Sequence, residues 1–243
     1  MHAARPDLQF IQPNITRTCE EREVYDTLLT LDGVHILELG CGKADHSRRI
    51  ATAHPTSTVL AAEVDRIQHQ ANLASDRPAN LTFTDFGAQA IGLPDASVEI
   101  VMMFKSLHHV PVDLLDTALA ELRRVLKPGG HAYLSEPLFA GPFNELIRIF
   151  NDEEVVRRAA FKAVCEAVTH GAFTLAGQVF FNVPVHYRDF AAFEARHLVV
   201  TYAERNVTGE QAARLRRLFE THQGTDGVRL TQSMRVDLLR KPD

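Results

Sequence analysis

The stretch ILELGCGKAD, residues 36–45, decides how this sequence folds. An apolar run that contains one carboxylate, Glu38, ends at Gly40 and Gly42, and a helical pattern follows over residues 46–53. An apolar run of this length predicts a buried strand, and the glycines predict a tight turn that leads into a helix. Such a turn lets a ligand come close to the backbone. The stretch therefore predicts the first strand, turn and helix of a nucleotide-binding α/β sheet.

The segments that follow this turn alternate between strand and helix patterns. Strands are predicted over residues 34–39, 56–62, 81–86 and 98–104, with a fifth that begins at residues 132–135, and helices over 67–74 and 113–126. A first helix is predicted from Thr18, because Thr18 and Glu21 have capping-box spacing. The alternation indicates a mostly parallel, doubly wound sheet with helices on both faces.

The pattern changes after Glu136. Helices are predicted over residues 142–170, with an interruption near Asn151, and over 189–200 and 209–222, with strands over 179–187 and 230–239. We expect the last strand to be antiparallel and the helices to cover the substrate. The predicted organisation is an N-terminal helical segment (residues 1–33), a ligand-binding core (34–136), and a cap with a final strand (137–243), all in one integrated domain.

Composition narrows the classes of function. The chain has 243 residues, 45% of them hydrophobic, and a net charge of −5 with no long basic run, which argues against a nucleic-acid partner. Three widely separated cysteines predict reduced thiols and a cytoplasmic location. No apolar run predicts a secretory signal or a membrane span, so stable membrane insertion is not expected.

The acid Glu63 helps to identify the ligand. It ends the second predicted strand, where a carboxylate can accept hydrogen bonds from both hydroxyls of a ribose. A nicotinamide-dependent oxidoreductase would share this acid, but Asp45 stands where its third glycine would be. Glu38 also has no use beside a pyrophosphate. It suits the sulfonium and ammonium groups of S-adenosylmethionine, so the oxidoreductase is the weaker alternative.

Five segments carry a resemblance to a known family. They are ELGCG (38–42), AEVD (62–65), LPDASVEIV (93–101), SLHHV (106–110) and LRRVLKPGG (122–130). In this order they resemble the motifs of class I S-adenosylmethionine-dependent methyltransferases, and most of all the small-molecule enzymes of ubiquinone and menaquinone biosynthesis. The resemblance implies an α/β, Rossmann-like fold with an antiparallel last strand and a helical substrate cap. It also implies S-adenosylmethionine as cofactor and S-adenosylhomocysteine as product.

The resemblance places the cofactor along the carboxyl ends of the first four strands. The cofactor-binding residues that it implies are Glu38, Gly40, Cys41, Gly42, Glu63, Val64, Asp85, Gly87, Ala88 and Phe104. Gly87 stands where the family usually has an acid that binds adenine, so we expect Asp85, or the backbone of Gly87 and Ala88, to take that role. Ala44 replaces the last glycine of the family's turn.

The acceptor side is predicted from the residues after the fourth and fifth strands. His108 and His109 are candidate general bases, although either imidazole could instead hold the loop. Lys105 hints at an acidic acceptor or is a snorkelling lysine. The predicted substrate-binding residues are Lys105, His109, Glu136, Phe139 and Tyr187. No metal site is predicted, because the sequence has no H-E-x-x-H motif and no paired cysteines.

These features predict an enzyme that transfers a methyl group to a small, aromatic or acidic, organic acceptor. The predicted partner is that small molecule alone, and the protein is expected to be a monomer or homodimer. A non-catalytic sensor or scaffold that binds S-adenosylmethionine is the main alternative, because the adenine acid is missing at Gly87. A methyltransferase of nucleic acids or proteins is a third alternative, which the acidic composition disfavours.

Overall fold

A computed structural model describes residues 8–198 and 207–243. Its helices are α1 (Glu21–Leu28), α2 (Asp45–Ala53), α3 (Arg66–Leu73), η1 (Leu107–His109), η2 (Val112–Leu114), α4 (Leu115–Val125), α5 (Pro142–Ile147), α6 (Glu154–Thr169), α7 (Phe190–His197) and α8 (Gly209–Glu220). Its strands are β1 (His35–Leu39), β2 (Thr58–Ala62), β3 (Leu81–Thr84), β4 (Val98–Phe104), β5 (Leu126–Pro137), β6 (Thr174–Tyr187), β7 (Gln223–Gly224) and β8 (Gly227–Arg240).

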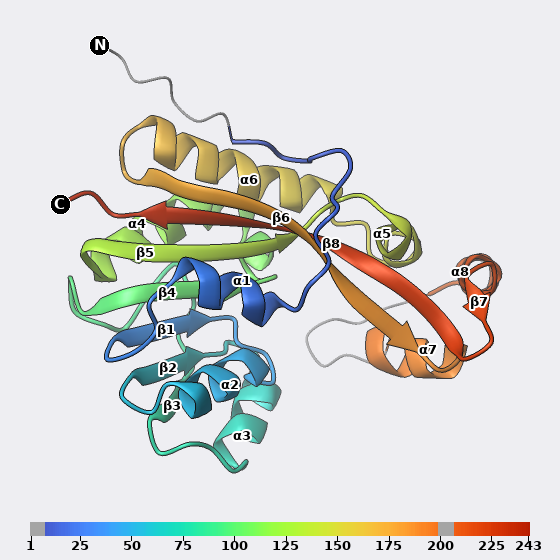
Figure 1. Cartoon of the computed structure of the whole chain (residues 1–243), viewed down its shortest axis with the longest axis horizontal. Helices are drawn as coiled ribbons and strands as arrows, with labels where there is room; N and C mark the ends of the chain where they lie inside the picture. Colours follow the sequence, from blue (N-terminus) through green and yellow to red (C-terminus); the bar gives the residue numbers. More distant parts are fainter. Residues whose placement is uncertain (1–7, 199–206) are drawn as a thin grey trace.

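The strands form one mixed sheet in the order β3-β2-β1-β4-β5-β8-β6, with β7 paired to β8 (Figure 1). The first five strands along this order are parallel, whereas β8 is antiparallel to both β5 and β6. The chain steps from β1 outward to β3 and then crosses back to β4 on the other side of β1. Ligands bind at the carboxyl ends of the strands at such a switch point. The predicted fold class, with its antiparallel last strand, is confirmed.

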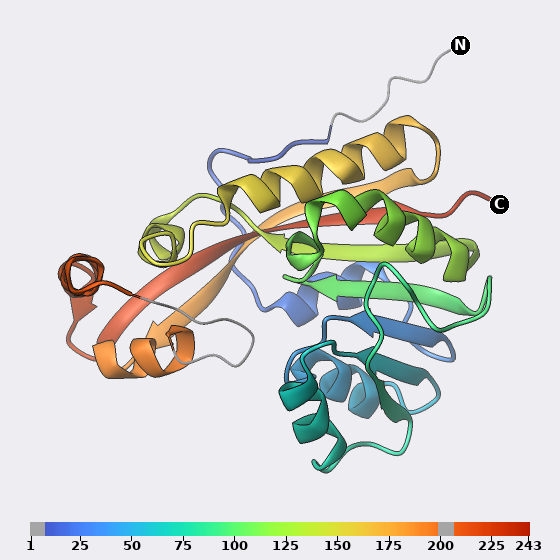
Figure 2. The same cartoon turned by 180° about the vertical axis from the view of Figure 1, so that it is seen from behind.

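Helices cover both faces of the sheet. In the view of Figure 1, α1 and α2 lie in front of it, and the reverse view of Figure 2 brings α4 to the front, with α6 beside it. One buried apolar cluster joins the strands to α4 and α6, and a second joins them to α1 and α2. The amphipathic helices thus bury their apolar sides on the sheet, as a doubly wound fold requires.

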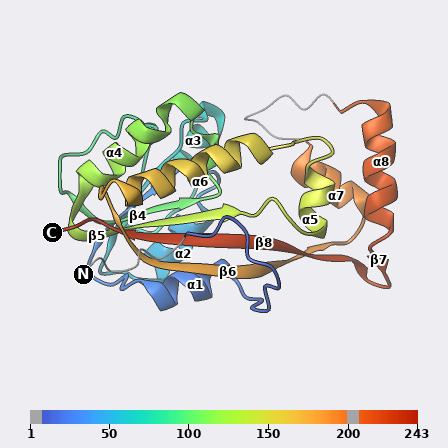
Figure 3. The same cartoon turned by 90° about the horizontal axis from the view of Figure 1, so that it is seen from above.

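The strands β6 and β8 are long and extend beyond the parallel part of the sheet. Their outer ends carry α5, α7 and α8, which lie together away from the core helices (Figure 3). A third apolar cluster, which includes Phe143, Tyr187, Phe193 and Phe219, holds these helices to the strand ends. The helix α6, which we expected in the cap, packs on the core sheet instead, through buried residues such as Ala163.

The first helix begins three residues after its predicted start. The backbone N–H of Glu20 donates to Glu23 Oε1 at 3.0 Å, so the capping pair is Glu20 and Glu23. Thr18 forms a bridge with Asn182 of β6 instead. The prediction from Thr18 and Glu21 was wrong because strand pairing keeps this residue in an extended segment.

The fifth strand begins directly after α4, at Leu126, and not near residue 132 as predicted. The Gly129 N–H donates to the Lys241 carbonyl at 3.1 Å, and the Lys241 N–H donates to the Gly130 carbonyl at 2.8 Å. This pairing includes the LKPGG segment in β5, with Gly129 at a φ of +74°. The helix predicted over 189–200 ends at His197, and its last two residues lie outside the described part.

Candidate active site

The Gly turn brings the ends of β1 and β4 together. Gly40 and Gly42 have φ of +67° and +53°, which glycine adopts without strain. A Cβ on Gly40 would lie 2.7 Å from Ser106 Cβ, whereas one on Gly42 would have no atom within 4 Å. The Ser106 hydroxyl also donates to the Leu39 carbonyl at 2.8 Å. Gly40 therefore serves the close approach of two strand ends, and Gly42 borders open space.

Glu63 lies beside this turn with both carboxylate oxygens fixed. It is 8% exposed. Its Oε2 accepts a hydrogen bond from the Gly42 N–H at 2.6 Å, and its Oε1 accepts one from the Asp65 N–H at 2.9 Å. Each oxygen keeps a further lone pair for a ligand hydroxyl. This arrangement suits the ribose role predicted for Glu63.

The residues on either side of Glu63 and Gly42 differ in character. Val64 is 60% exposed and offers an apolar surface next to the acid. Cys41 is buried, and its burial raises the pKa of the thiol, so the sulfur stays protonated. The amide of Asn72 donates to the Gly42 carbonyl at 2.8 Å. Val64 is thus placed to cover a ligand, and Cys41 serves packing.

Glu38 is buried under the turn. Its Oε2 accepts a hydrogen bond from the Ser47 hydroxyl in α2. Burial raises the pKa of Glu38 to about 8, which favours the neutral acid at neutral pH. A cationic ligand group nearby would favour the ionised form. The structure shows Glu38 bonded to Ser47 of α2. Its predicted role beside a cationic ligand group stays a prediction.

The predicted cofactor contact at Phe104 is not supported by the position of its side chain. The ring stacks on His46, with centroids 4.0 Å apart, and packs edge-on against Tyr25. It belongs to the buried cluster under α1 and α2. The side chain of Phe104, the last residue of β4, points into the core. Only its backbone could contact a ligand.

The side chain of Gln89 lies beside Gly87, in the segment that follows β3. Asp85 is exposed and Ala88 is buried. A Cβ on Gly87 would lie 2.6 Å from Gln89 Oε1, so the carboxamide of Gln89 fills the space beside Gly87. A carboxamide both donates and accepts hydrogen bonds, as reading an adenine edge requires. Gly87, where an acid was expected, was the signal in the sequence that could have pointed to Gln89, because a glycine leaves room for a neighbouring side chain.

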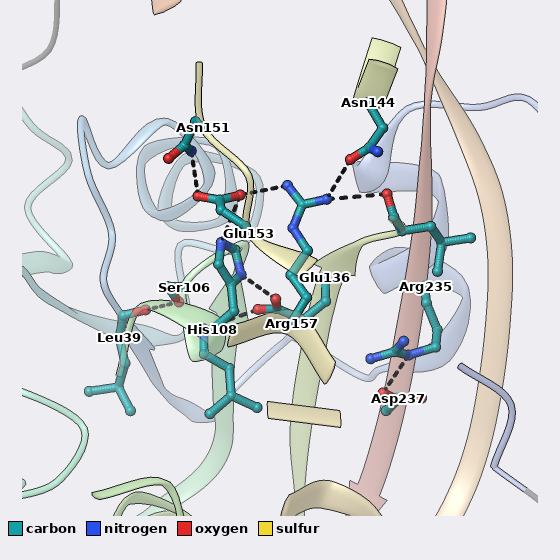
Figure 4. A network of polar contacts seen from close by, with 12 residues as sticks. Leu39, Ser106, His108, Glu136, Asn144, Asn151, Glu153, Arg157, Arg235 and Asp237 are labelled. Atoms are coloured by element: carbon teal, nitrogen blue, oxygen red, sulfur yellow. Dashed lines mark hydrogen bonds and ion pairs between the residues drawn. The ribbon is translucent and has the colours of Figure 1, made fainter. Parts of the chain in front are cut away.

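The two histidines after β4 lie in different environments, and Figure 4 shows that of His108. His108 is buried, and its Nδ1 bonds Glu136 while its Nε2 lies 3.7 Å from Glu153 Oε2. Glu153 is itself paired with Arg157 at 2.6 Å. His109 lies with its ring centroid 4.1 Å from that of His108 and is exposed. His108 is therefore held between two carboxylates, whereas His109 is accessible.

Glu136 fixes the loop and does not line the cavity. Its Oε1 accepts a hydrogen bond from the Leu107 N–H at 3.0 Å. Burial would raise the pKa of Glu136, but His108, Arg235 and the Leu107 amide outweigh burial and lower it, so the carboxylate stays ionised. We had expected this residue to touch the substrate. The structure gives it a positioning role because its strand end lies beneath the histidine loop.

A cavity of about 300 Å³ lies between this loop and the cap. Predicted residues in its wall are Lys105, His108, His109 and Tyr187. Phe139 is absent from this wall, and its ring lies under the guanidinium of Arg148, 4.7 Å from the centroid. Wall residues that sequence reasoning missed include Ile147, Arg157, Arg196 and His197. They come from the cap and α6, for which the sequence offered no motif.

Three possible metal ligands meet at one end of the cavity. One ligand atom each from His108, His109 and Glu153 lies within 4.8 Å of the others. This cluster could not be predicted from the sequence, because Glu153 is far from the histidines along the chain. Arg157 already pairs with Glu153, and Glu136 binds His108. A cation at this point would have to compete with a guanidinium, so we interpret the cluster as an ion-pair network.

Comparisons with known proteins agree with this geometry. Residues 36–130 match a family described as "Methyltransferase domain". The chain is 30% identical over 110 residues to 27-O-demethylrifamycin SV methyltransferase of Amycolatopsis mediterranei, and 29% identical over 119 residues to the O-methyltransferase rstn1 of Aspergillus nomiae. These stretches are 43% and 47% of this chain, and only 39% and 52% of those proteins.

A solved structure shows the same fold over nearly the whole chain. A candidate methyltransferase of Bacillus halodurans C-125 superposes with a TM-score of 0.63 at 16% identity, over 92% of this chain and 99% of that one. Within the described residues, no helix has both the length and the apolar character needed to cross a bilayer.

The residues around the Gly turn fit S-adenosylmethionine. Gly42 leaves its face of the turn open, and Glu63 retains acceptor capacity for ribose hydroxyls. Val64 adds an exposed apolar surface beside them. These residues lie within residues 36–130, the part of the chain that is similar to the methyltransferase domain family.

Proposed function

We propose that this protein transfers a methyl group from S-adenosylmethionine to a hydroxyl oxygen of a small organic acceptor. One observation carries the proposal: His109, which follows β4, opens into the cavity beside the strand end that contacts the Gly turn. A cofactor at the turn and an acceptor in the cavity would meet at this point. Oxygen is favoured as the receiving atom because one relative is named an O-methyltransferase and another a methyltransferase of a 27-O-demethyl compound.

When bound, S-adenosylmethionine supplies the methyl group from its sulfonium. The sulfur becomes the neutral thioether of the leaving S-adenosylhomocysteine. Glu63 holds the ribose, and the backbone at Gly42 allows the close approach. Gln89 replaces the missing acid at the adenine edge. In-line transfer then depends mainly on positioning and on exclusion of water.

His109 takes the proton of the acceptor hydroxyl as the new oxygen–carbon bond forms. Partial loss of water around the ring and the neighbouring His108 lower the pKa of His109, which keeps it neutral and able to accept a proton near pH 7. His108, bound by Glu136 and close to Glu153, positions the loop. Of the two candidate bases, this proposal assigns the chemistry to His109 alone.

The acceptor has an apolar body. The cavity wall includes Phe143, Ile147, Leu138 and Tyr187, and such walls suit an aromatic or aliphatic ring. The resemblance to the ubiquinone and menaquinone methyltransferases agrees with a ring-bearing acceptor. That subtype remains our proposal, since the two curated relatives act as O-methyltransferases under other names.

The test is a screen of phenols and aliphatic alcohols with S-adenosylmethionine labelled in the methyl group. Transfer of label to oxygen in any of them, lost in His109→Gln, supports the proposal. Binding of S-adenosylhomocysteine without transfer to any acceptor would favour the sensor or scaffold. Transfer to nitrogen or carbon would overturn the choice of oxygen.

A further inference from the structure

Two cationic side chains open into the acceptor cavity without a carboxylate partner. Lys105 follows β4, and Arg196 lies in the last turn of α7, and both belong to the cavity wall. Across the described residues, neither forms an ion pair with a carboxylate. The third cation of the wall, Arg157, is by contrast paired with Glu153 at 2.6 Å. Among the described residues, one cation of the cavity wall thus forms an ion pair, and Lys105 and Arg196 have no carboxylate oxygen within 4.0 Å.

The backbone of Lys105 has a conformation that is unusual for a residue other than glycine. Its φ is +56°, in the left-handed region, which is unfavourable for a residue with a side chain. The N–H of Lys105 donates to the Ser135 carbonyl at 2.7 Å, which extends the pairing of β4 with β5 by one residue. Non-glycine residues held in this conformation occur often at ligand sites. Here the conformation turns the chain sharply between Phe104 and Ser106 and presents the lysine to the cavity.

The two cations are close enough to influence each other. Removal of water around Lys105 lowers the pKa of its ammonium, and the charge of Arg196 lowers it further, while Glu21 and Glu136 oppose the change. Arg196 also lies over the Tyr187 ring, 5.9 Å from its centroid. An anion between Lys105 and Arg196 would reduce their repulsion and pair with both.

The rest of the wall limits what that anion is attached to. Phe143, Ile147 and Tyr187 give the cavity an apolar side. Among the described wall residues, the one carboxylate is that of Glu153, which pairs with Arg157. A ligand with an apolar ring and a carboxylate fits this division better than a free inorganic anion or a neutral ring does.

We propose that Lys105 and Arg196 form an anion-binding subsite that takes the carboxylate of the methyl acceptor. The acceptor class is thus a hydroxylated carboxylic acid with an apolar ring. This inference rests on the proposed function, because it treats the cavity as the acceptor site. The carboxylate of the methionine part of S-adenosylmethionine is the other possible source of the anion, and the experiment separates the two.

The probes are 4-hydroxybenzoate and 4-hydroxybenzamide, which share the ring and hydroxyl and differ in charge. Each is titrated into the full-length protein saturated with S-adenosylhomocysteine, and binding is followed by ligand-observed NMR. We expect the carboxylate to bind at least about tenfold more tightly, which corresponds to about 1.4 kcal/mol. In Lys105→Met and in Arg196→Met the preference falls below about threefold, and Arg196→Lys keeps part of it.

Lys162→Met is the matched control, because Lys162 lies on α6, is exposed and pairs with Glu166 outside the cavity. It should retain the full preference. Equal binding of the two probes, or binding of neither up to about 10 mM, would overturn the subsite. A loss of S-adenosylhomocysteine affinity in Lys105→Met, with the probe preference unchanged, would assign the anion to the cofactor. Failure of the wild-type protein to bind S-adenosylhomocysteine would instead refute the proposed function.

Discussion

Glu63 Oε2 accepts a hydrogen bond from the Gly42 N–H at 2.6 Å. Glu63 follows β2, and Gly42 belongs to the turn after β1, so this bond joins the ends of two paired strands. A second bond, from the Cys41 N–H to the Ala62 carbonyl at 3.0 Å, supports the same junction. The acid and the turn therefore form one preorganised unit, to which a ribose can bind without rearrangement of the backbone.

Replacement of Glu63 by alanine should weaken the binding of S-adenosylmethionine by more than about threefold, since a lost hydrogen-bonding acid costs roughly 1 kcal/mol or more. Calorimetry measures the change. Glu99→Ala is the control, because Glu99 bonds His35 and Lys127, which do not belong to the site. A smaller effect than threefold, or an equal effect in both variants, would remove Glu63 from the ribose site.

Alanine variants of the two turn glycines should differ, one mainly in the stability of the fold and the other mainly in cofactor affinity. Gly40→Ala should lower the free energy of unfolding by about 2–4 kcal/mol, because the new Cβ meets Ser106 Cβ and φ is positive. Gly42→Ala should cost only about 1 kcal/mol of stability, for φ alone. Its methyl group would project into the open space and weaken cofactor binding.

Denaturant unfolding and calorimetry of the two glycine variants give both quantities. Equal stability losses would contradict the close approach at Gly40. Unchanged affinity for S-adenosylhomocysteine in Gly42→Ala would show that the ligand does not face this part of the turn.

The pH profile of methyl transfer should reveal the base. The pKa of His109 lies below its usual 6.5, so the base form dominates at and above that pH. The rate should be level from about pH 6.5 upward and fall as acid protonates the imidazole. His109→Gln should lower kcat by about 10²-fold or more with little change in cofactor affinity. A rate that keeps rising between pH 7 and 9, or an unaffected variant, would exclude His109 as the base.

Glu38 should make stability depend on pH. Its folded pKa of about 8 is above the unfolded value near 4.5, so the folded state holds a proton that the unfolded state has lost. Stability from this group is complete below the unfolded pKa and declines as pH rises toward 8. Glu38→Gln keeps an acceptor for Ser47 and should therefore gain several degrees in Tm over wild type at pH 8, with little difference at pH 4.5. A difference in Tm that does not grow with pH would contradict this account of Glu38.

Chelation distinguishes the two interpretations of the cluster at His108, His109 and Glu153. Because Arg157 pairs with Glu153, dialysis against EDTA should leave methyl transfer unchanged. Loss of activity that added Mg²⁺ or Zn²⁺ restores would show that the cluster binds a metal.

The parallel core could be predicted from sequence because its signals are local. An apolar run followed by Gly40 and Gly42, repeated alternation of strand and helix patterns, and an acid at Glu63 each act over a few residues. The start of β5 was mispredicted because the backbone pairing of Gly129 and Gly130 with Lys241, far along the chain, includes this segment in the strand. Local patterns do not contain that pairing.

The candidate site was predictable only on its cofactor side. The turn and Glu63 belong to motifs, whereas Arg196 and Glu153 meet the histidine loop through the packing of α7 and α6 around the long β6–β8 pair. The orientation of the Phe104 ring was not predictable for a related reason, since strand alternation alone does not say which layer, core or cleft, receives the ring.

The most direct test of the central claim is calorimetric titration of the wild-type protein with S-adenosylhomocysteine, with NADH titrated in parallel. The account predicts micromolar binding of S-adenosylhomocysteine and no binding of NADH. Binding of NADH alone, or of neither ligand, would contradict the assignment of the Gly turn and Glu63 to S-adenosylmethionine.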